Sequence, residues 1–233
     1  MFQNFCAFAF GRRTVLGFFP EEGKPSFFTN ESNGIFRPLR MWRPISITRM
    51  SIGQGINVTP LQIVQAWSAL ANNGTMMQPY IVDHVKYPDG RTVYSRPHAK
   101  GQPITADTAH RIRQALKTVT EDGGTGLRAA IKGYEVAGKT GTAQICQPAD
   151  PVKGTKAGYN STDYFASFIG YVPADNPQFL LLVSAEHPTK VAHTGAGVSA
   201  PTFKRIAERT LEYMQIDPEM EPEPTGLRRT AMR

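Results

Sequence analysis

The chain has 233 residues, of which 40% are apolar and 10% aromatic, so it can bury a hydrophobic core and is expected to form one globular domain or most of one. Its net charge of +7 suits an anionic partner, but no run of five or more basic residues occurs, which argues against nucleic-acid binding. Cys6 and Cys146 form no C-x-x-C pair and the histidines lack ligand spacing, so neither a metal nor another cofactor is expected.

The first ten residues are apolar, but they do not have the pattern of a signal peptide. No basic region precedes them, and Arg12 and Arg13 follow them on the wrong side. No stretch of the chain approaches the length needed to span a bilayer. From these residues we expect neither an export signal nor an anchor.

In chain order, residues 1–50 predict a short helix or strand followed by an irregular, proline-containing loop. The first clear helix begins at Thr59, because Thr59-Pro60-Leu61-Gln62 is a capping box with proline at the first helical position. Gly74 is expected to end it in the left-handed conformation. The face expected to be buried carries Leu61, Val64, Trp67, Ser68 and Ala71.

A hairpin is predicted over Pro79–Val93, around the turn pair Asp89-Gly90. A second helix is predicted from Thr105 to the glycines at 123 and 124. Its apolar side carries Ala109, Ile112, Leu116 and Val119.

Three strands and a helix follow. The strands are residues 134–137 continuing into 139–142, Tyr164–Tyr171 and Phe179–Ala185, and the turn at 173–177 makes the last two antiparallel neighbours. The helix is expected to be capped by Ser199 and to bury Phe203, Ile206, Ala207, Thr210, Leu211 and Met214. The expected fold class is α/β of the α+β kind, an antiparallel sheet flanked by helices. Residues 1–216 form the domain and residues 217–233 a disordered tail.

The run Lys139-Thr140-Gly141-Thr142 fits two unrelated chemistries. Counted from Gly133 it matches G-x-x-x-x-G-K-T, the nucleotide-binding P-loop, and counted from Lys139 it is the K-T-G motif of penicillin-binding serine enzymes. A P-loop follows a buried strand and opens into a helix. Here bulky strand-forming residues occupy the loop positions and a glycine follows Thr140, so the second interpretation is favoured.

Four segments in order resemble the transpeptidase domain of class B penicillin-binding proteins, the cell-division or elongation type. Phe10-Gly11-Arg12-Arg13-Thr14 resembles the F-G-x-x-T turn, and residues 51–62 (SIGQGINVTPLQ) resemble the G-Q-G…T-P-L-Q segment. Residues 137–144 (AGKTGTAQ) resemble the A-G-K-T-G-T-A strand, and residues 168–173 (FIGYVP) resemble the strand after it. The resemblance implies a penicillin-binding transpeptidase or serine β-lactamase-like fold.

The resemblance also implies an activity and roles for residues. A serine attacks the D-Ala-D-Ala bond of a peptidoglycan stem peptide, the acyl group passes to an amine on a neighbouring strand, and β-lactams acylate the same serine. Lys139 and Thr142 are the implied catalytic residues: Lys139 places positive charge beside the nucleophile, and the Thr142 N–H is one oxyanion donor. Thr140, Gly141 and Thr142 are the implied substrate-binding residues, with the threonine hydroxyls on the substrate carboxylate.

Two of the family's three motifs do not occur. No lysine has a serine three residues before it and no asparagine has a serine two residues before it, so S-x-x-K and S-x-N are absent. We therefore expect an N-terminally truncated transpeptidase domain that is inactive alone and needs the missing N-terminal part as a partner. Division or elongation proteins are further implied partners, and the family implies the cell envelope, at the periplasmic face of the inner membrane. The alternatives are a non-catalytic penicillin-fold binding protein and a P-loop nucleotide binder.

Overall fold

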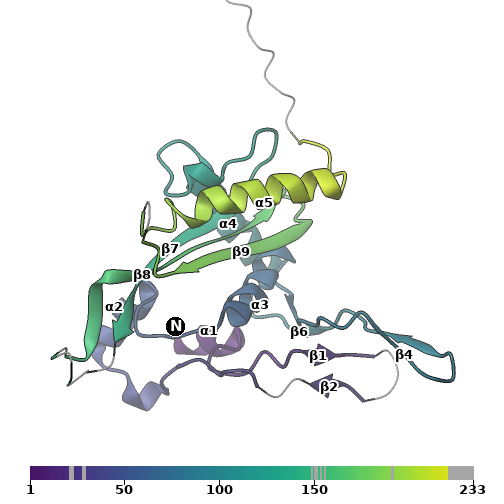
Figure 1. The fold of residues 1–233 in the computed structure, drawn as a ribbon, viewed down its shortest axis with the longest axis horizontal. Helices are drawn as coiled ribbons and strands as arrows, with labels where there is room; N and C mark the ends of the chain where they lie inside the picture. Colours follow the sequence, from purple (N-terminus) through teal and green to yellow (C-terminus); the bar gives the residue numbers. More distant parts are fainter. Residues whose placement is uncertain are drawn as a thin grey trace, which may run out of the picture. The chain divides into compact units, whose positions relative to one another are not determined.

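The computed structural model describes residues 1–20, 24–27, 30–147, 149, 152, 154, 156–189 and 192–219 (Figure 1). The chain divides into two compact units, Met1–Ala115 and Leu116–Arg233. Most of the expected tail, residues 220–233, lies outside the described residues.

The first unit combines short helices with two-stranded antiparallel sheets, in which β1 pairs with β2, β3 with β6 and β4 with β5. Its elements are α1 (Phe2–Ala7), β1 (Gly17–Phe18), β2 (Ser26–Phe27), the 3₁₀ helix η1 (Leu39–Met41), α2 (Pro44–Ser51), α3 (Pro60–Ala71), β3 (Met76–Met77), β4 (His84–Lys86), β5 (Thr92–Tyr94), β6 (Ala99–Gly101) and most of α4 (Ala106–Lys117). The predicted hairpin is confirmed, with Gly90 in the left-handed region at a φ of 85°.

Helix α3 starts as predicted but buries a different face. Thr59 caps it, its hydroxyl accepting the N–H of Gln62 at 3.1 Å while the Gln62 side-chain oxygen accepts the Thr59 N–H at 2.8 Å. The buried residues are Gln62, Gln65, Ala66 and Ala69, not the predicted apolar set. The prediction was wrong because it weighed apolarity alone. The amide of Gln62 is buried because it donates to the carbonyls of Arg12 and Asn33, at 2.7 and 2.9 Å.

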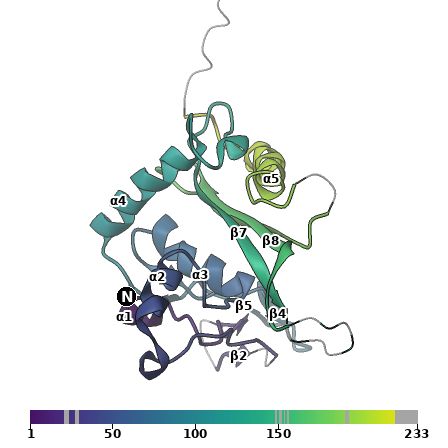
Figure 2. The same ribbon diagram turned by 90° about the vertical axis from the view of Figure 1, so that its left-hand side faces the viewer.

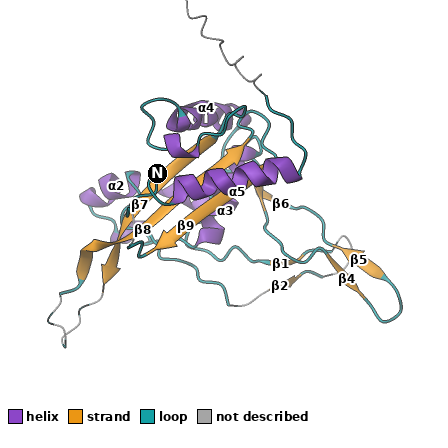
Figure 3. Ribbon diagram, turned by 45° about the horizontal axis from the view of Figure 1, so that its top comes forward, coloured by secondary structure: helices purple, strands orange, loops and turns teal. Residues whose placement is uncertain are grey.

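The second unit is built on a three-stranded antiparallel sheet in the order β7-β8-β9 (Figure 3). Its elements are the 3₁₀ helices η2 (Thr118–Thr120) and η3 (Leu127–Ala129), β7 (Ala137–Gln147), β8 (Gly158–Val172), β9 (Phe179–Glu186) and α5 (Ser199–Tyr213). Helix α5 runs along one face of the sheet and contacts β8, β9 and η3 (Figure 2). The predicted antiparallel pairing of the last two strands is confirmed, whereas the first strand begins at Ala137 rather than at residue 134 and runs to Gln147.

The core of this unit lies between α5 and the sheet. Phe168 of β8 and Phe203 of α5 stack edge to face, with ring centroids 4.7 Å apart. The fully buried members of this core are Ala129, Ile131, Val136, Phe168, Val172, Ala200, Phe203, Ala207 and Leu211.

The prediction for helix α5 was wrong in two respects. Ile206 and Met214 are more than 40% exposed, and Ser199 is the first helical residue rather than the cap, its hydroxyl donating to the Ala166 carbonyl at 3.1 Å.

Candidate functional site at the edge of the sheet

Strand β7 carries all four predicted site residues along one edge of the sheet. Lys139, Thr140, Gly141 and Thr142 lie opposite Ile169, Phe168, Ser167 and Ala166 of β8. Among the described residues no strand pairs with the other side of β7. The backbone N–H and C=O groups on that side can therefore accept a further extended chain.

The alternation of side chains along a strand divides the four residues between two faces. Thr140 pairs with Phe168, which packs on α5, so Thr140 and Thr142 lie on the α5 face. Lys139 and Gly141 lie on the opposite face. The sequence analysis assigned these residues catalytic and substrate-binding roles but did not predict how they divide between the two faces.

The side chain of Lys139 is long enough to reach Thr140, whose side chain lies on the other face of the sheet. It is exposed, and its ammonium donates to the carbonyl of Thr140 at 2.9 Å and lies 3.5 Å from the Thr140 hydroxyl. No carboxylate of a described residue pairs with it. The edge of β7 therefore offers a cation and a hydroxyl, side by side, to an incoming anion.

The hydroxyl of Thr140 is held by the turn that follows η2. Its Oγ1 atom lies 3.1 Å from Oγ1 of Thr125. Glycine is needed on either side of Thr125, because a Cβ on Gly124 would lie 2.3 Å from the Val119 carbonyl oxygen and one on Gly126 would lie 2.8 Å from Cε2 of Phe168. The sequence analysis interpreted Gly123 and Gly124 only as the end of a helix, although Gly124 and Gly126 bring Thr125 to the candidate site.

Thr142 is held by the loop that precedes α5. The Gly195 N–H donates to the Thr142 hydroxyl at 3.1 Å, and a Cβ on Gly195 would lie 2.2 Å from the Ser167 carbonyl oxygen. Because its lone pair accepts this bond, the Thr142 hydroxyl keeps its own proton for donation. The sequence analysis did not identify Gly195.

The structure gives Gly141 a packing role. A Cβ at this position would lie 2.4 Å from Oγ of Ser167, its partner across the strands. The substrate-binding role that the resemblance implies for Gly141 stays a prediction. Ser167 is a second residue that the sequence analysis did not single out.

The G-x-x-x-x-G-K-T match does not form a P-loop. Lys139 and Thr140 lie inside β7, which continues as a strand to Gln147, and no helix opens after them. The backbone N–H groups of this segment are therefore part of a sheet rather than a phosphate cradle. The nucleotide-binding alternative is overturned.

Within the described ranges no three His, Cys, Asp or Glu side chains are grouped to hold a metal ion.

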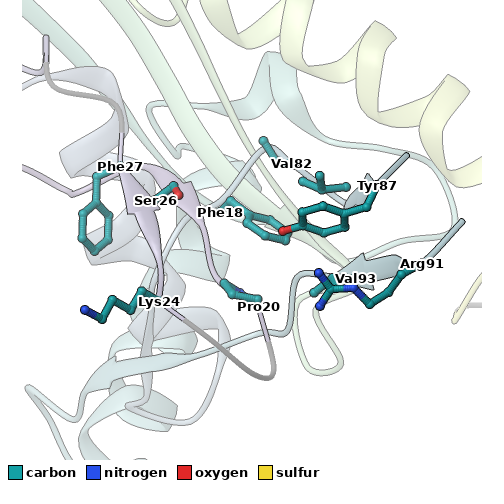
Figure 4. A pocket seen from close by; sticks show the side chains of 10 residues that line it. Phe18, Pro20, Lys24, Ser26, Phe27, Val82, Tyr87, Arg91 and Val93 are labelled. Atoms are coloured by element: carbon teal, nitrogen blue, oxygen red, sulfur yellow. The ribbon is translucent and has the colours of Figure 1, made fainter. Parts of the chain in front are cut away.

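The first unit contains a hollow of about 430 Å³ that shares no residue with the predicted site (Figure 4). Its lining is mainly apolar and aromatic, including Phe18, Val82 and Val93, and the Arg91 guanidinium lies 4.3 Å from the centre of the Tyr87 ring. Arg91 is thus stacked on Tyr87, a structural contact. This hollow offers no nucleophile and base in contact with each other among its described hydrogen bonds.

The fold and the K-T-G-T strand at the sheet edge define the penicillin-binding class of transpeptidase domains. The penicillin binding protein transpeptidase domain model matches residues 15–208, and this chain belongs to that family.

Similar proteins and structures agree with the family. The chain is 32% identical over 90% of its length to the probable peptidoglycan D,D-transpeptidase PenA of Neisseria meningitidis, and 34% identical over 94% to the stage V sporulation protein D of Bacillus subtilis. It covers 34% and 31% of those two proteins.

Two solved structures show the same fold. Penicillin binding protein 3 of Mycobacterium tuberculosis, complexed with ampicillin, matches with a TM-score of 0.77 at 31% identity, over 96% of this chain and 47% of that one. The transpeptidase domain of penicillin-binding protein 3 from Burkholderia pseudomallei matches with a TM-score of 0.74 at 30% identity, over 94% of this chain and 59% of that one. The chain thus spans about a third of the curated relatives and about half of these structures.

Proposed function

We propose that residues 1–216 are the C-terminal part of a peptidoglycan D,D-transpeptidase domain, and that Lys139–Thr142 is its substrate-binding edge. The observation that carries this proposal is that the K-T-G-T run lies in β7, an edge strand that pairs only with β8 among the described residues. There the exposed Lys139 ammonium lies 3.5 Å from the Thr140 hydroxyl. Family membership and the names of the D,D-transpeptidase relatives support it.

The proposed chemistry uses both the side chains and the backbone of β7. A stem peptide adds to the free edge as a further strand, which aligns its backbone with β7. Its terminal carboxylate binds the Lys139 ammonium and the hydroxyls of Thr140 and Thr142 through charge-assisted hydrogen bonds. The Thr142 N–H contributes one donor to the oxyanion hole, where charge develops as the peptide bond is attacked.

The nucleophile is not among residues 1–233, because no S-x-x-K or S-x-N run occurs. We propose that a polypeptide segment outside this sequence supplies both motifs and that this chain alone is inactive. β-Lactams, found in solved complexes of the M. tuberculosis neighbour, are proposed ligands of the completed site.

The test combines this chain with a second polypeptide that carries the two missing motifs. We expect no covalent adduct of a labelled penicillin on the chain alone, and an adduct on the second polypeptide when both are present. Lys139→Ala should lower the acylation rate at least about tenfold, since it removes a charge-assisted bond to the ligand carboxylate. Lys132→Ala is the matched control, because Lys132 is exposed and lies outside β7. Equal rates for the two variants would contradict the assigned role of Lys139.

A second candidate function, a non-catalytic protein that binds stem peptides, is favoured by the absence of S-x-x-K. The same preparation separates the two. Binding of a D-Ala-D-Ala peptide to the chain alone, lost in Lys139→Ala, without acylation in the presence of the second polypeptide, would support this alternative.

We place the proposed enzyme at the periplasmic face of the inner membrane, in the cell envelope, where division or elongation proteins would be its partners. This rests on the peptidoglycan-directed relatives. Among the described residues, no helix has both the length and the apolarity to cross a bilayer.

A further inference from the structure

The first unit carries a strongly cationic surface formed by η1, α2 and the residues next to them. Four arginines, Arg37, Arg40, Arg43 and Arg49, line one groove of about 800 Å³ there, and all four are exposed. We refer to these four residues as the arginine face.

The charge of the arginine face is not compensated. No Asp or Glu occurs between Glu31 and Asp83 in the sequence. None of the four arginines forms an ion pair with a residue that the structure describes. A guanidinium is a planar fork of donors that matches phosphate and carboxylate oxygens, so the face is built to receive anions.

Exposed apolar side chains alternate with the arginines along the sequence, and two of them, Met41 and Ile45, line the same groove. Leu39, Met41, Ile45 and Ile47 are each more than half exposed, at 58%, 54%, 53% and 53%. Exposed aliphatic groups gain nothing from a phosphate or carboxylate alone, but they gain from an apolar environment next to one. The ligand that satisfies both sets of side chains has an anionic layer above an apolar one.

The backbone under the arginine face is held by an aromatic cluster. The Trp42 indole N–H donates to the Arg37 carbonyl at 2.9 Å, and its ring packs edge to face on Phe36 and Phe2, with centroids 6.1 and 5.5 Å away. The arginines are therefore presented from an anchored backbone, which lowers the entropy lost on binding.

We propose that the arginine face docks on the surface of a bilayer that contains anionic phospholipid. The guanidiniums bind lipid phosphates, and the aliphatic side chains enter the boundary between headgroups and acyl chains. Four basic residues are at the lower end of the clusters that bind anionic membranes, so the attachment is reversible. The proposal uses no residue of β7 and is independent of the proposed function.

The experiment is flotation of the full 233-residue chain with vesicles of phosphatidylglycerol and phosphatidylcholine in equal parts, and with pure phosphatidylcholine vesicles. We expect binding to the first and not the second, weakened by salt because the Debye length falls to about 3 Å at 1 M. Arg40→Glu with Arg43→Glu should lower the partition coefficient by more than about 25-fold, at about fivefold for each guanidinium that no longer binds a lipid phosphate.

The matched control is Arg205→Glu with Arg209→Glu, which makes the same change of charge on exposed positions of α5. It should leave binding within about threefold of the unmutated chain, since long-range effects are screened. Ile45→Ser tests the apolar half of the face and should also weaken binding. Circular dichroism checks that every variant is folded.

Three outcomes would overturn the proposal. The first is no binding to the anionic vesicles at low salt. The second is an equal loss of binding in the control pair, which would show a general effect of net charge. The third is undiminished binding of Ile45→Ser together with displacement from the vesicles by soluble polyglutamate, which would identify an acidic polypeptide as the occupant.

Discussion

Val15 has a backbone conformation that its side chain disfavours. Its φ is 63°, in the left-handed region that a β-branched residue avoids. The reason for the conformation lies in tertiary contacts. The Glu31 carboxylate accepts the N–H groups of Val15 and Leu16 and the Thr14 hydroxyl, and this holds the turn.

This conformation predicts an inverted order of stability at position 15. At an ordinary position glycine is less stable than alanine by about 0.5–1 kcal/mol. Here alanine keeps the strained Cβ, so Val15→Gly should be more stable than Val15→Ala by about 1 kcal/mol. Urea unfolding of the two variants measures the difference. If Val15→Ala were equal to or more stable than Val15→Gly, the strain would not exist in solution.

Gln62 shows why the buried face of α3 could not be predicted from apolarity. Its side chain is 1% exposed and makes three hydrogen bonds, one to its own cap and two to carbonyls far away in sequence. The capping box could be predicted because its two residues are close in sequence. The hydrogen bonds to the Arg12 and Asn33 carbonyls could not be predicted, because those residues are distant in sequence. Gln62→Ala should destabilise the chain by about 2–4 kcal/mol, because it leaves two carbonyls unsatisfied and weakens the cap. The exposed Gln102→Ala is the control, and a loss below about 1 kcal/mol would contradict the account.

At the scale of elements, an ion-pair cluster fixes the segments around the base of β7. The Lys117 ammonium lies 2.5 Å from a Glu135 carboxylate oxygen and 3.0 Å from one of Asp175, which joins the end of α4 to the residues before β7 and to the turn between β8 and β9. The strands and the turn were predicted, but the contact between them was not. Charge pairing between distant segments leaves no periodic signal in a sequence.

This cluster predicts a pH dependence of stability. The hydrogen bond to Glu135, more than the opposing burial, raises the pKa of Lys117 above its usual value. The resulting stability is therefore complete below about pH 10.4, the unfolded value, and is lost as the pH rises through the higher folded pKa. Lys117→Met should lower stability by about 1–2 kcal/mol at pH 8, because the two carboxylates are partly exposed, and should remove part of the alkaline decline. The free energy of unfolding, measured from pH 8 to 11 for the unmutated chain and Lys117→Met, tests this prediction, with Lys132→Met as the control. If the free energies of the unmutated chain and Lys117→Met fell in parallel with pH, the prediction would be contradicted.

At the scale of the whole molecule, individual helices and strands were predicted from the sequence better than the contacts between them. The hairpin, the antiparallel pairing of β8 with β9 and the start of α3 were confirmed because turn residues, strand patterns and capping boxes are local signals. The buried faces of α3 and α5, the Ser199 cap and the extent of α4, which ends at Lys117, were predicted wrongly. The K-T-G-T strand was found from local signals, together with its family resemblance. Its supports, Thr125, Ser167 and Gly195, lie far away in sequence and were missed, because only the register of β7 on β8 brings them to the site.

The distribution of buried residues predicts that the chain does not exchange its amide hydrogens evenly. The sheet of the second unit is held by a continuous core under α5, so β8 and α5 should open only with free energies close to that of global unfolding. The pairs β1–β2 and β4–β5 have two or three residues per strand, and small two-stranded sheets are marginally stable. Hydrogen exchange followed by mass spectrometry should therefore show the slowest exchange in β8 and α5 and the fastest among strands in β4 and β5.

Protection of β4 and β5 equal to that of β8 would mean that the first unit has a source of stability beyond its described core. In Gln62→Ala, which weakens only the first unit, exchange in β8 should stay unchanged, and this separates the stabilities of the two units.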